Sequence, residues 1–204
     1  MKEYKYSLST QIMGTEDGKY TYEVRKIFDT TEGKRAVVIA LYPTVSLMNP
    51  YIMDNSTLYL LNKSNELGYN DFRIVNIYSK VCKGKLSAKQ LAEEDDNISY
   101  LDKVFREEKN DNTDIIIAWG SSLKFNETTK SIKIHVLKSI KKYIQPDRIK
   151  QFSAGDLKTK SCMTPHVLWM GLHCGEMWYT EVVSVDALLD ELNNTKDKKK
   201  ITQV

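Results

Sequence analysis

The sequence has little of what marks secreted, membrane-bound or disulfide-stabilised proteins. Its 204 residues include three cysteines, Cys82, Cys162 and Cys174, at irregular spacing. That number and spacing favour free thiols in a reducing cytoplasm over a disulfide framework. No apolar run approaches the roughly 20 residues that cross a bilayer, and the first residues lack the apolar core of a signal peptide. We therefore expect a cytoplasmic protein that has no contact with a membrane.

Strong charge and the common cofactor motifs are also missing. The formal net charge is only +3, which permits nucleic-acid binding without requiring it. The sequence contains no Walker A motif, dinucleotide-binding glycine fingerprint, zinc-protease helix or nucleophile elbow. Four potential metal ligands, Cys162, His166, His173 and Cys174, lack the paired spacing of a structural zinc site. We therefore expect neither a metal nor a cofactor.

What the chain does contain is apolar strands that alternate with helical patterns. Residues 35–41, 72–81 and 114–120 are typical of strands covered on both faces, and residues 148–153 indicate a weaker fourth strand. Strands that alternate with helices favour a parallel sheet with right-handed crossovers. The helical segments that we predict are 54–67, 87–94, 98–109, 128–144 and 185–192.

The remaining segments complete the predicted architecture. Residues 20–28 alternate as an antiparallel edge strand does, and residues 159–176 read as irregular. Residues 193–204 are expected to form a basic, frayed tail. We predict one α/β domain over residues 1–192. It is a three-layer α/β/α sandwich with a four-stranded, mainly parallel sheet and an N-terminal antiparallel edge strand.

Six short motifs stand in order along the central part of the chain. They are Leu-Tyr-Pro-Thr at 41–44, Asp-Asn-Ser-Thr at 54–57, Gly-Tyr at 68–69, Val-Asn-Ile-Tyr at 75–78, Ala-Trp-Gly at 118–120, and Thr-Lys at 159–160 followed by His166. Together they resemble the motif order of a bacterial family, domain-of-unknown-function family 1643. The resemblance implies a role in DNA metabolism on a phage or another mobile genetic element.

That layout is in turn similar to the uracil-DNA glycosylase superfamily. The similarity implies that Tyr42, Pro43 and Thr44 lie under a base pocket and that His166 faces the leaving base. Two positions depart from the pattern, because Tyr42 replaces an Asn and Val167 replaces a Pro. A phenol with a pKa of about 10 is a poor general base at neutral pH, although its ring can stack on a base. These departures favour a binding module or a divergent enzyme over a standard base-excision enzyme.

Three of the candidate residues have a structural interpretation beside the functional one. Asp54 and Thr57 either form an N-cap at a helix start or point into the cleft. Asn76 lies in an apolar strand, where its amide needs a partner, which is either the first loop or a ligand. Gly120 would let the backbone approach a ligand closely.

Basic residues are the last candidates for ligand contact. Lys160, with Arg25, Lys26 and Lys158, would bring positive charge to the mouth of the cleft if the first strand and the late loop are neighbours. The alternative is that all four are ordinary solvated side chains.

The predicted function is binding of nucleic acid or a nucleotide in a glycosylase-like fold, without base excision by the usual mechanism. DNA or a nucleotide is the expected partner. One alternative is an active hydrolase of a nucleoside, nucleotide or modified base, with Asp54 and His166 as its catalytic pair. A second alternative is a module that binds a protein partner and keeps only a vestigial cleft.

Overall fold

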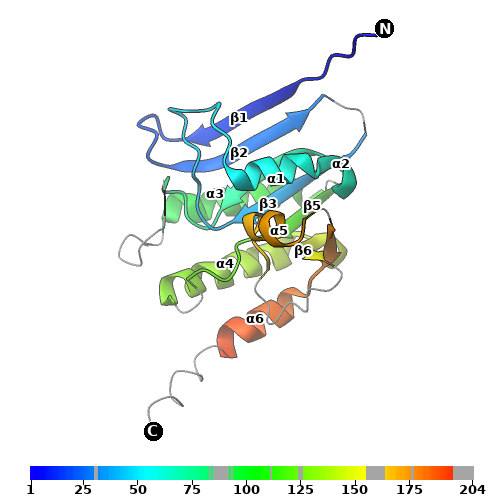
Figure 1. The fold of residues 1–204 in the computed structure, drawn as a ribbon. Helices are drawn as coiled ribbons and strands as arrows, with labels where there is room; N and C mark the ends of the chain where they lie inside the picture. Colours follow the sequence, from blue (N-terminus) through cyan, green and yellow to red (C-terminus); the bar gives the residue numbers. More distant parts are fainter. Residues whose placement is uncertain are drawn as a thin grey trace.

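A seven-stranded mixed sheet runs through the centre of the molecule, as the computed structural model shows (Figure 1). The structure describes residues 1–29, 32–82, 84, 92, 94–110, 112–123, 126–154, 164–175 and 177–194. The strand order is β1-β2-β4-β3-β5-β6-β7. The strands are β1 (Leu8–Gly14), β2 (Thr21–Phe28), β3 (Lys34–Ala40), β4 (Tyr69–Asn76), β5 (Thr113–Ile117), β6 (Ile149–Ala154) and β7 (Trp178–Val182).

The centre of the sheet is parallel and its two flanks are antiparallel. Strands β4, β3, β5 and β6 pair in parallel, which confirms the predicted parallel core. Strand β2 pairs antiparallel with β4, as expected of residues 20–28. The prediction of four strands plus one edge strand was nevertheless wrong, because β1 adds to β2 and β7 adds to β6.

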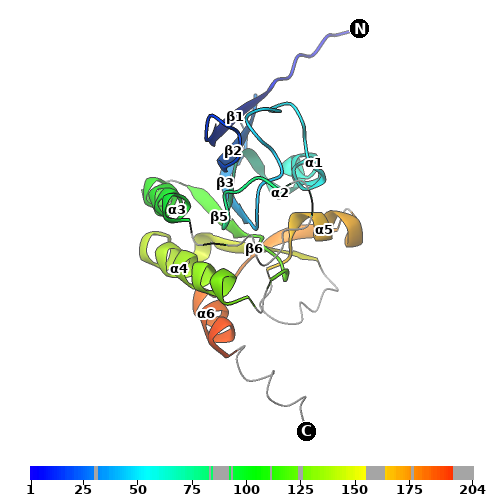
Figure 2. The same cartoon turned by 90° about the vertical axis from the view of Figure 1, so that its left-hand side faces the viewer.

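Helices cover both faces of this sheet (Figure 2). Helices α1 (Asn55–Asn62), α2 (Ser64–Leu67) and α5 (Val167–His173) lie on one face. Helices α3 (Asp95–Glu107), α4 (Glu127–Tyr143) and α6 (Val185–Asn194) lie on the other, with short 3₁₀ turns at Glu108–Asn110 and Pro146–Arg148. Among the described residues, no helix is both long and apolar enough to cross a membrane.

Several predicted helix limits change. The segment at 54–67 is two helices, since Lys63 separates α1 from α2, and Gly68 ends α2 with a left-handed φ of 76°. The segment at 159–176 is not irregular throughout, because it contains α5. Helix α6 continues to Asn194, two residues into the predicted tail. Most of the predicted helix at 87–94 and all of the tail from residue 195 lie outside the described residues.

The continuous apolar runs follow from burial on both faces. In β3, Val37 and Ile39 belong to the core under α3 and α4, whereas Ala36 and Val38 belong to the core under α1 and α5. All four are at most 1% exposed. Because side chains on both faces of β3 are buried, apolar residues are favoured at every position, and the sequence of the strand is therefore continuously apolar.

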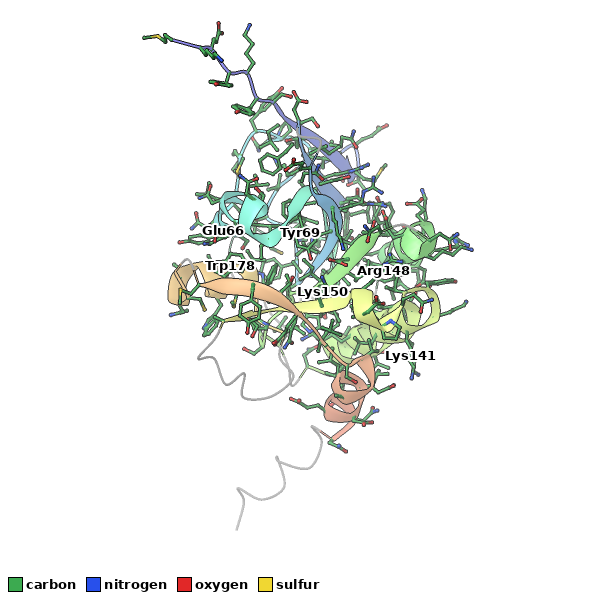
Figure 3. The ribbon with its side chains drawn as sticks, turned by 90° about the vertical axis from the view of Figure 1, so that its right-hand side faces the viewer. Glu66, Tyr69, Lys141, Arg148, Lys150 and Trp178 are labelled. Carbon is green, nitrogen blue, oxygen red and sulfur yellow. The ribbon has the colours of Figure 1, made fainter. Side chains whose placement is uncertain are left out.

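Hydrogen-bonded side chains occupy the amino ends of the parallel strands. Tyr69 begins β4, and its hydroxyl donates to Asp114 Oδ2 at 2.8 Å. Lys150 Nζ on β6 donates to the same oxygen at 2.7 Å, and Tyr69 and Lys150 are labelled at this end of the sheet in Figure 3. Burial raises the pKa of the Tyr69 hydroxyl, which keeps it a donor. This end of the sheet is therefore filled by mutually paired side chains.

A charged network occupies the α3 side of β2 and β4. The Arg73 guanidinium, which is mostly buried, lies 2.8 Å from Glu23 Oε2 and 2.6 Å from Glu108 Oε1. Beside it, Arg25 binds Asp71 at 2.6 Å. Burial alone would raise the pKa of the Asp71 and Glu108 carboxyls, but the guanidinium groups hold both below their ordinary values. The network fixes β2, β4 and α3 together.

Candidate ligand-binding site

A cavity of about 360 Å³ lies on the α1 and α5 side of the sheet, at the carboxyl ends of β3 and β4. Its floor is formed by the alternate residues of three neighbouring strands, which are Val24, Val38, Ala40, Ile74 and Asn76. The chain leaves β3 toward α1 on one face and leaves β5 toward α4 on the other (Figure 2). Ligands of open α/β sheets bind where successive connections diverge in this way.

The structure brings seven of the nine predicted site residues to this cavity. They are Tyr42, Pro43, Thr44, Asp54, Thr57, Asn76 and His166. Gly120 lies nearby but does not line the cavity, and Lys160 lies outside the described residues. Four segments that are distant in sequence therefore meet at one place, although a ligand contact by any of them stays a prediction.

Asp54 links the first loop to the start of α1. Its Oδ1 atom accepts the backbone N–H of Thr57 at 2.7 Å, which confirms the N-cap interpretation. Its Oδ2 atom accepts a short hydrogen bond from the Thr44 hydroxyl. All three residues line the cavity, so the capping and cleft-facing interpretations of Asp54 are compatible. The carboxylate is held in a fixed position, with lone pairs remaining on both oxygens.

Asn76 presents an unpartnered amide to the cavity. The residue is only 3% exposed, and its side chain forms no hydrogen bond within the described part of the chain. Its backbone carbonyl, in contrast, accepts from Asn97 Nδ2 at 3.0 Å, which anchors the end of β4. The alternative of a structural bond from the Asn76 side chain to the first loop is thus not observed. The amide remains accessible from the cavity, so it can donate hydrogen bonds to a ligand or a water and accept them.

His166 supplies a neutral donor. Its Nδ1 atom accepts the backbone N–H of Leu168 at 3.2 Å, at the start of α5, so the proton of the neutral imidazole resides on Nε2. Burial lowers the pKa of His166, and the nearby Asp54 carboxylate only partly opposes that effect. An uncharged Nε2–H group is therefore available in the cavity at neutral pH.

Gly120 positions the segment that carries His166. It has a left-handed φ of 67°, and a Cβ atom at this position would lie 3.0 Å from His166 Cβ. Its backbone N–H donates to Thr164 O at 2.9 Å. Gly120 thus allows close packing against the His166 segment, and the approach of its backbone to a ligand stays a prediction.

Tyr42 contributes its ring rather than its hydroxyl. The residue lines the cavity, its side chain also packs against the core under α3 and α4, and its hydroxyl donates to the carbonyl of Gly84 at 3.2 Å. This arrangement holds the ring over the carboxyl end of β3. It agrees with a stacking surface better than with a general base.

The predicted basic residues do not reach the cavity. Arg25 points to the opposite face of the sheet, where it binds Asp71. Lys26 is on the cavity face but is 4% exposed and donates to Thr10 Oγ1 at 2.8 Å. No Lys or Arg lines the cavity within the described ranges, which do not include Lys158 and Lys160. The interpretation of Arg25 as a charge at the cleft mouth was therefore wrong. Burial lowers the pKa of Lys26, but the Asp54 carboxylate opposes that effect, so Lys26 lies near the cavity without lining it.

Sequence reasoning missed the wall that α5 contributes. Trp169, Leu172 and His173 line the cavity at positions that form one stripe of the helix. Nothing in the sequence separates these side chains from core residues, and their segment was predicted to be irregular. Within the described residues, no group of three or more His, Cys, Asp or Glu side chains is placed to hold a metal ion.

Comparison with known proteins agrees with the motif order. No curated protein matches the chain. A family model, by contrast, matches residues 22–161, which include β3 to β6 and therefore the whole parallel core, together with all but the first residue of β2. His166 and α5 follow this matched region. The chain thus belongs to the family described as "Protein of unknown function (DUF1643)".

Proposed function

We propose that the chain binds a nucleobase in the cavity at the carboxyl ends of β3 and β4, as part of a nucleic acid. The observation that carries this proposal is that the Asn76 amide, which forms no hydrogen bond with the described residues, lines the same cavity as the neutral Nε2–H of His166. An amide offers both donors and an acceptor, and the imidazole adds one donor. This set matches the polar edge of a heterocyclic base.

The rest of the cavity suits a flat ring. Val38 and Ile74 provide an apolar floor, and Tyr42 and Trp169 are aromatic residues of the lining. A volume of about 360 Å³ is at the lower end of the range of small-molecule sites. Mostly apolar walls with a few fixed polar groups are what such sites use to orient a ligand.

Among the described lining residues there is no Lys or Arg, which favours a base over a polyphosphate. Phosphate sites use Lys, Arg or clustered backbone N–H groups, and no Lys or Arg lines the described cavity. The phosphates of a bound nucleotide would therefore lie outside it. A base that has left its stack enters a protein in this manner.

A fold related to uracil-DNA glycosylases is part of the proposal. What supports it is the central order β4-β3-β5-β6, a Pro43 loop after β3, Asn76 at the end of β4 and His166 after β6. This likeness concerns the fold, and function has to be argued from the site. The DNA metabolism of a mobile genetic element remains the setting that we propose.

The matched variants Asn76→Leu and Asn97→Leu test the binding proposal. Leu at position 76 removes an amide that has no partner, so we expect binding of single-stranded oligonucleotides to be lost while stability is kept or raised. Leu at position 97 removes two hydrogen bonds, to Asn76 O and Ile77 O, which should lower stability by about 1–3 kcal/mol. Calorimetric titration and urea unfolding measure the two effects. Undiminished binding by Asn76→Leu would refute the proposal.

Hydrolysis of a glycosidic bond is the second candidate, because Asp54 and His166 line the same cavity. Asp54 would hold the attacking water and His166 Nε2–H would stabilise the leaving base. Incubation with uracil-, hypoxanthine- and mismatch-containing DNA tests it. A product that is lost in His166→Ala but kept in His135→Ala, at an exposed position on α4, would establish the enzyme. The absence of product together with retained binding would leave the binding function alone.

A further inference from the structure

One face of α5 is both exposed to solvent and part of the cavity wall. Trp169 is 39% exposed and Leu172 is 60% exposed, and His173 is also exposed. All three line the cavity. Since they stand at i, i+3 and i+4, they form one stripe along the helix. We call this stripe the mouth of the cavity. Its side chains would contact the part of a ligand that lies outside the cavity.

The Trp169 ring packs on a neighbouring ring, and the helix that carries it is closely packed. It packs on the His173 ring, with centroids 5.1 Å apart and an interplanar angle of 38°. Helix α5 is itself seated closely on α1, because a Cβ atom on Gly171 would lie 2.2 Å from Tyr59 Cγ. The two helices lie side by side in both views (Figures 1 and 2). Little ordering of the indole is therefore needed when a ligand arrives.

The mouth favours a second base over a phosphate. Its only ionisable lining groups in the described chain are Asp54, His166, His173 and Tyr42, and none is a Lys or Arg. Among these described residues an anionic group would meet no Lys or Arg, whereas a flat base would meet an indole face. Stacking of bases on aromatic side chains is a major source of affinity for single strands, and it tolerates any base.

We propose that Trp169 stacks on the base adjacent to the one in the cavity, so that the protein binds a dinucleotide step of single-stranded nucleic acid. This inference rests on the proposed function and specifies its ligand. In a duplex, the adjacent base stays paired and stacked on its own neighbours, and freeing it costs energy. A single strand can present both bases without that cost.

The chain carries its own probe for this contact. Of its three tryptophans, Trp119 is 2% exposed and Trp178 is 4% exposed. Quenching of tryptophan fluorescence by a ligand therefore reports mainly on Trp169. The ligands to titrate are the four deoxynucleoside monophosphates, the four homo-dinucleotides, a ten-nucleotide single strand and its duplex. We expect quenching, and we expect the best dinucleotide to bind about 5- to 150-fold more tightly than its mononucleotide.

Two variants and a control separate stacking from general surface effects, with anisotropy of a labelled single strand as the readout. Trp169→Ala should lose the gain from the second base, and Trp169→Phe should keep most of it. Tyr179→Ala, at a 47% exposed aromatic on β7 outside the cavity, should bind as the wild type does. Circular dichroism checks that each variant is folded.

Three results would overturn the inference. If a dinucleotide binds no more tightly than a mononucleotide, Trp169 does not stack on a second base, although the proposed function stands. The same holds if the duplex binds as tightly as the single strand. If no nucleic-acid ligand binds at all, both proposals fail.

Discussion

Ala40→Leu tests whether the cavity is empty space in solution. Ala40 ends β3 and lines the cavity floor, so a larger side chain at this position extends into the hollow of about 360 Å³. Leu adds three carbons to Ala, and each buried methylene contributes about 0.8 kcal/mol. We therefore expect the free energy of unfolding to stay unchanged or to rise, by at most about 2 kcal/mol. Ligand binding should be lost at the same time, because the added side chain occupies the ligand's place.

Ala36→Leu is the matched control. Ala36 lies four residues earlier on the same strand and the same face, but it is 0% exposed in the core under α1 and α5. Leu has no room there, and such overpacking costs about 1–3 kcal/mol. Urea unfolding followed by circular dichroism measures both variants. If Ala40→Leu were destabilised as strongly as Ala36→Leu, there would be no free space at the carboxyl end of β3, and the proposed site would not exist.

Three further substitutions probe the supports of the site. Gly171→Ala sets a Cβ against the Tyr59 ring, so we expect the free energy of unfolding to fall by about 1–3 kcal/mol in thermal unfolding. Adding Tyr59→Ala should recover part of that loss. If Gly171→Ala is as stable as the wild type, the two helices do not pack this closely. Arg73→Met leaves Glu108 and its network without their main cation. We expect this change to lower the free energy of unfolding, measured in urea, by about 3–5 kcal/mol. Unchanged stability would contradict the burial of these charges. Burial lowers the pKa of His166, so the unfolded chain takes up more protons as the pH falls from 7 to 5, and stability should fall with it. His166→Gln should flatten that slope, and an identical slope would show that His166 titrates normally.

The parts of the fold that sequence reasoning found are those with two buried faces. Strand β3 is apolar without interruption because Val37 and Val38 are buried on opposite sides. Strand β1 has no apolar pattern, since Leu8–Gly14 is exposed along most of its length. The strand forms because it pairs with β2. Strand β7 is similarly half exposed. Edge strands of this kind depend on a neighbour and not on their own pattern.

The candidate site was found in part for a comparable reason. Polar residues at the carboxyl ends of parallel strands converge by geometry, so Asp54 and Asn76 could be placed together from sequence. The direction of the Arg25 side chain could not be predicted, because a shift of one residue in the register of a strand moves each side chain to the opposite face. Helix α5 was hidden because Gly171 interrupts its helical propensity, and the Gly is needed there by the close contact with Tyr59.

The two bonds of the Asp54 carboxylate have a practical consequence for measurement. A molecule that binds either oxygen shares that atom with the Thr44 hydroxyl or with the amide of Thr57, and so weakens one of these two hydrogen bonds. Occupancy of the hollow is then transmitted to the opening turn of α1. Amide proton exchange at Thr57 would register that occupancy by NMR without any label, even for a compound that leaves every tryptophan untouched.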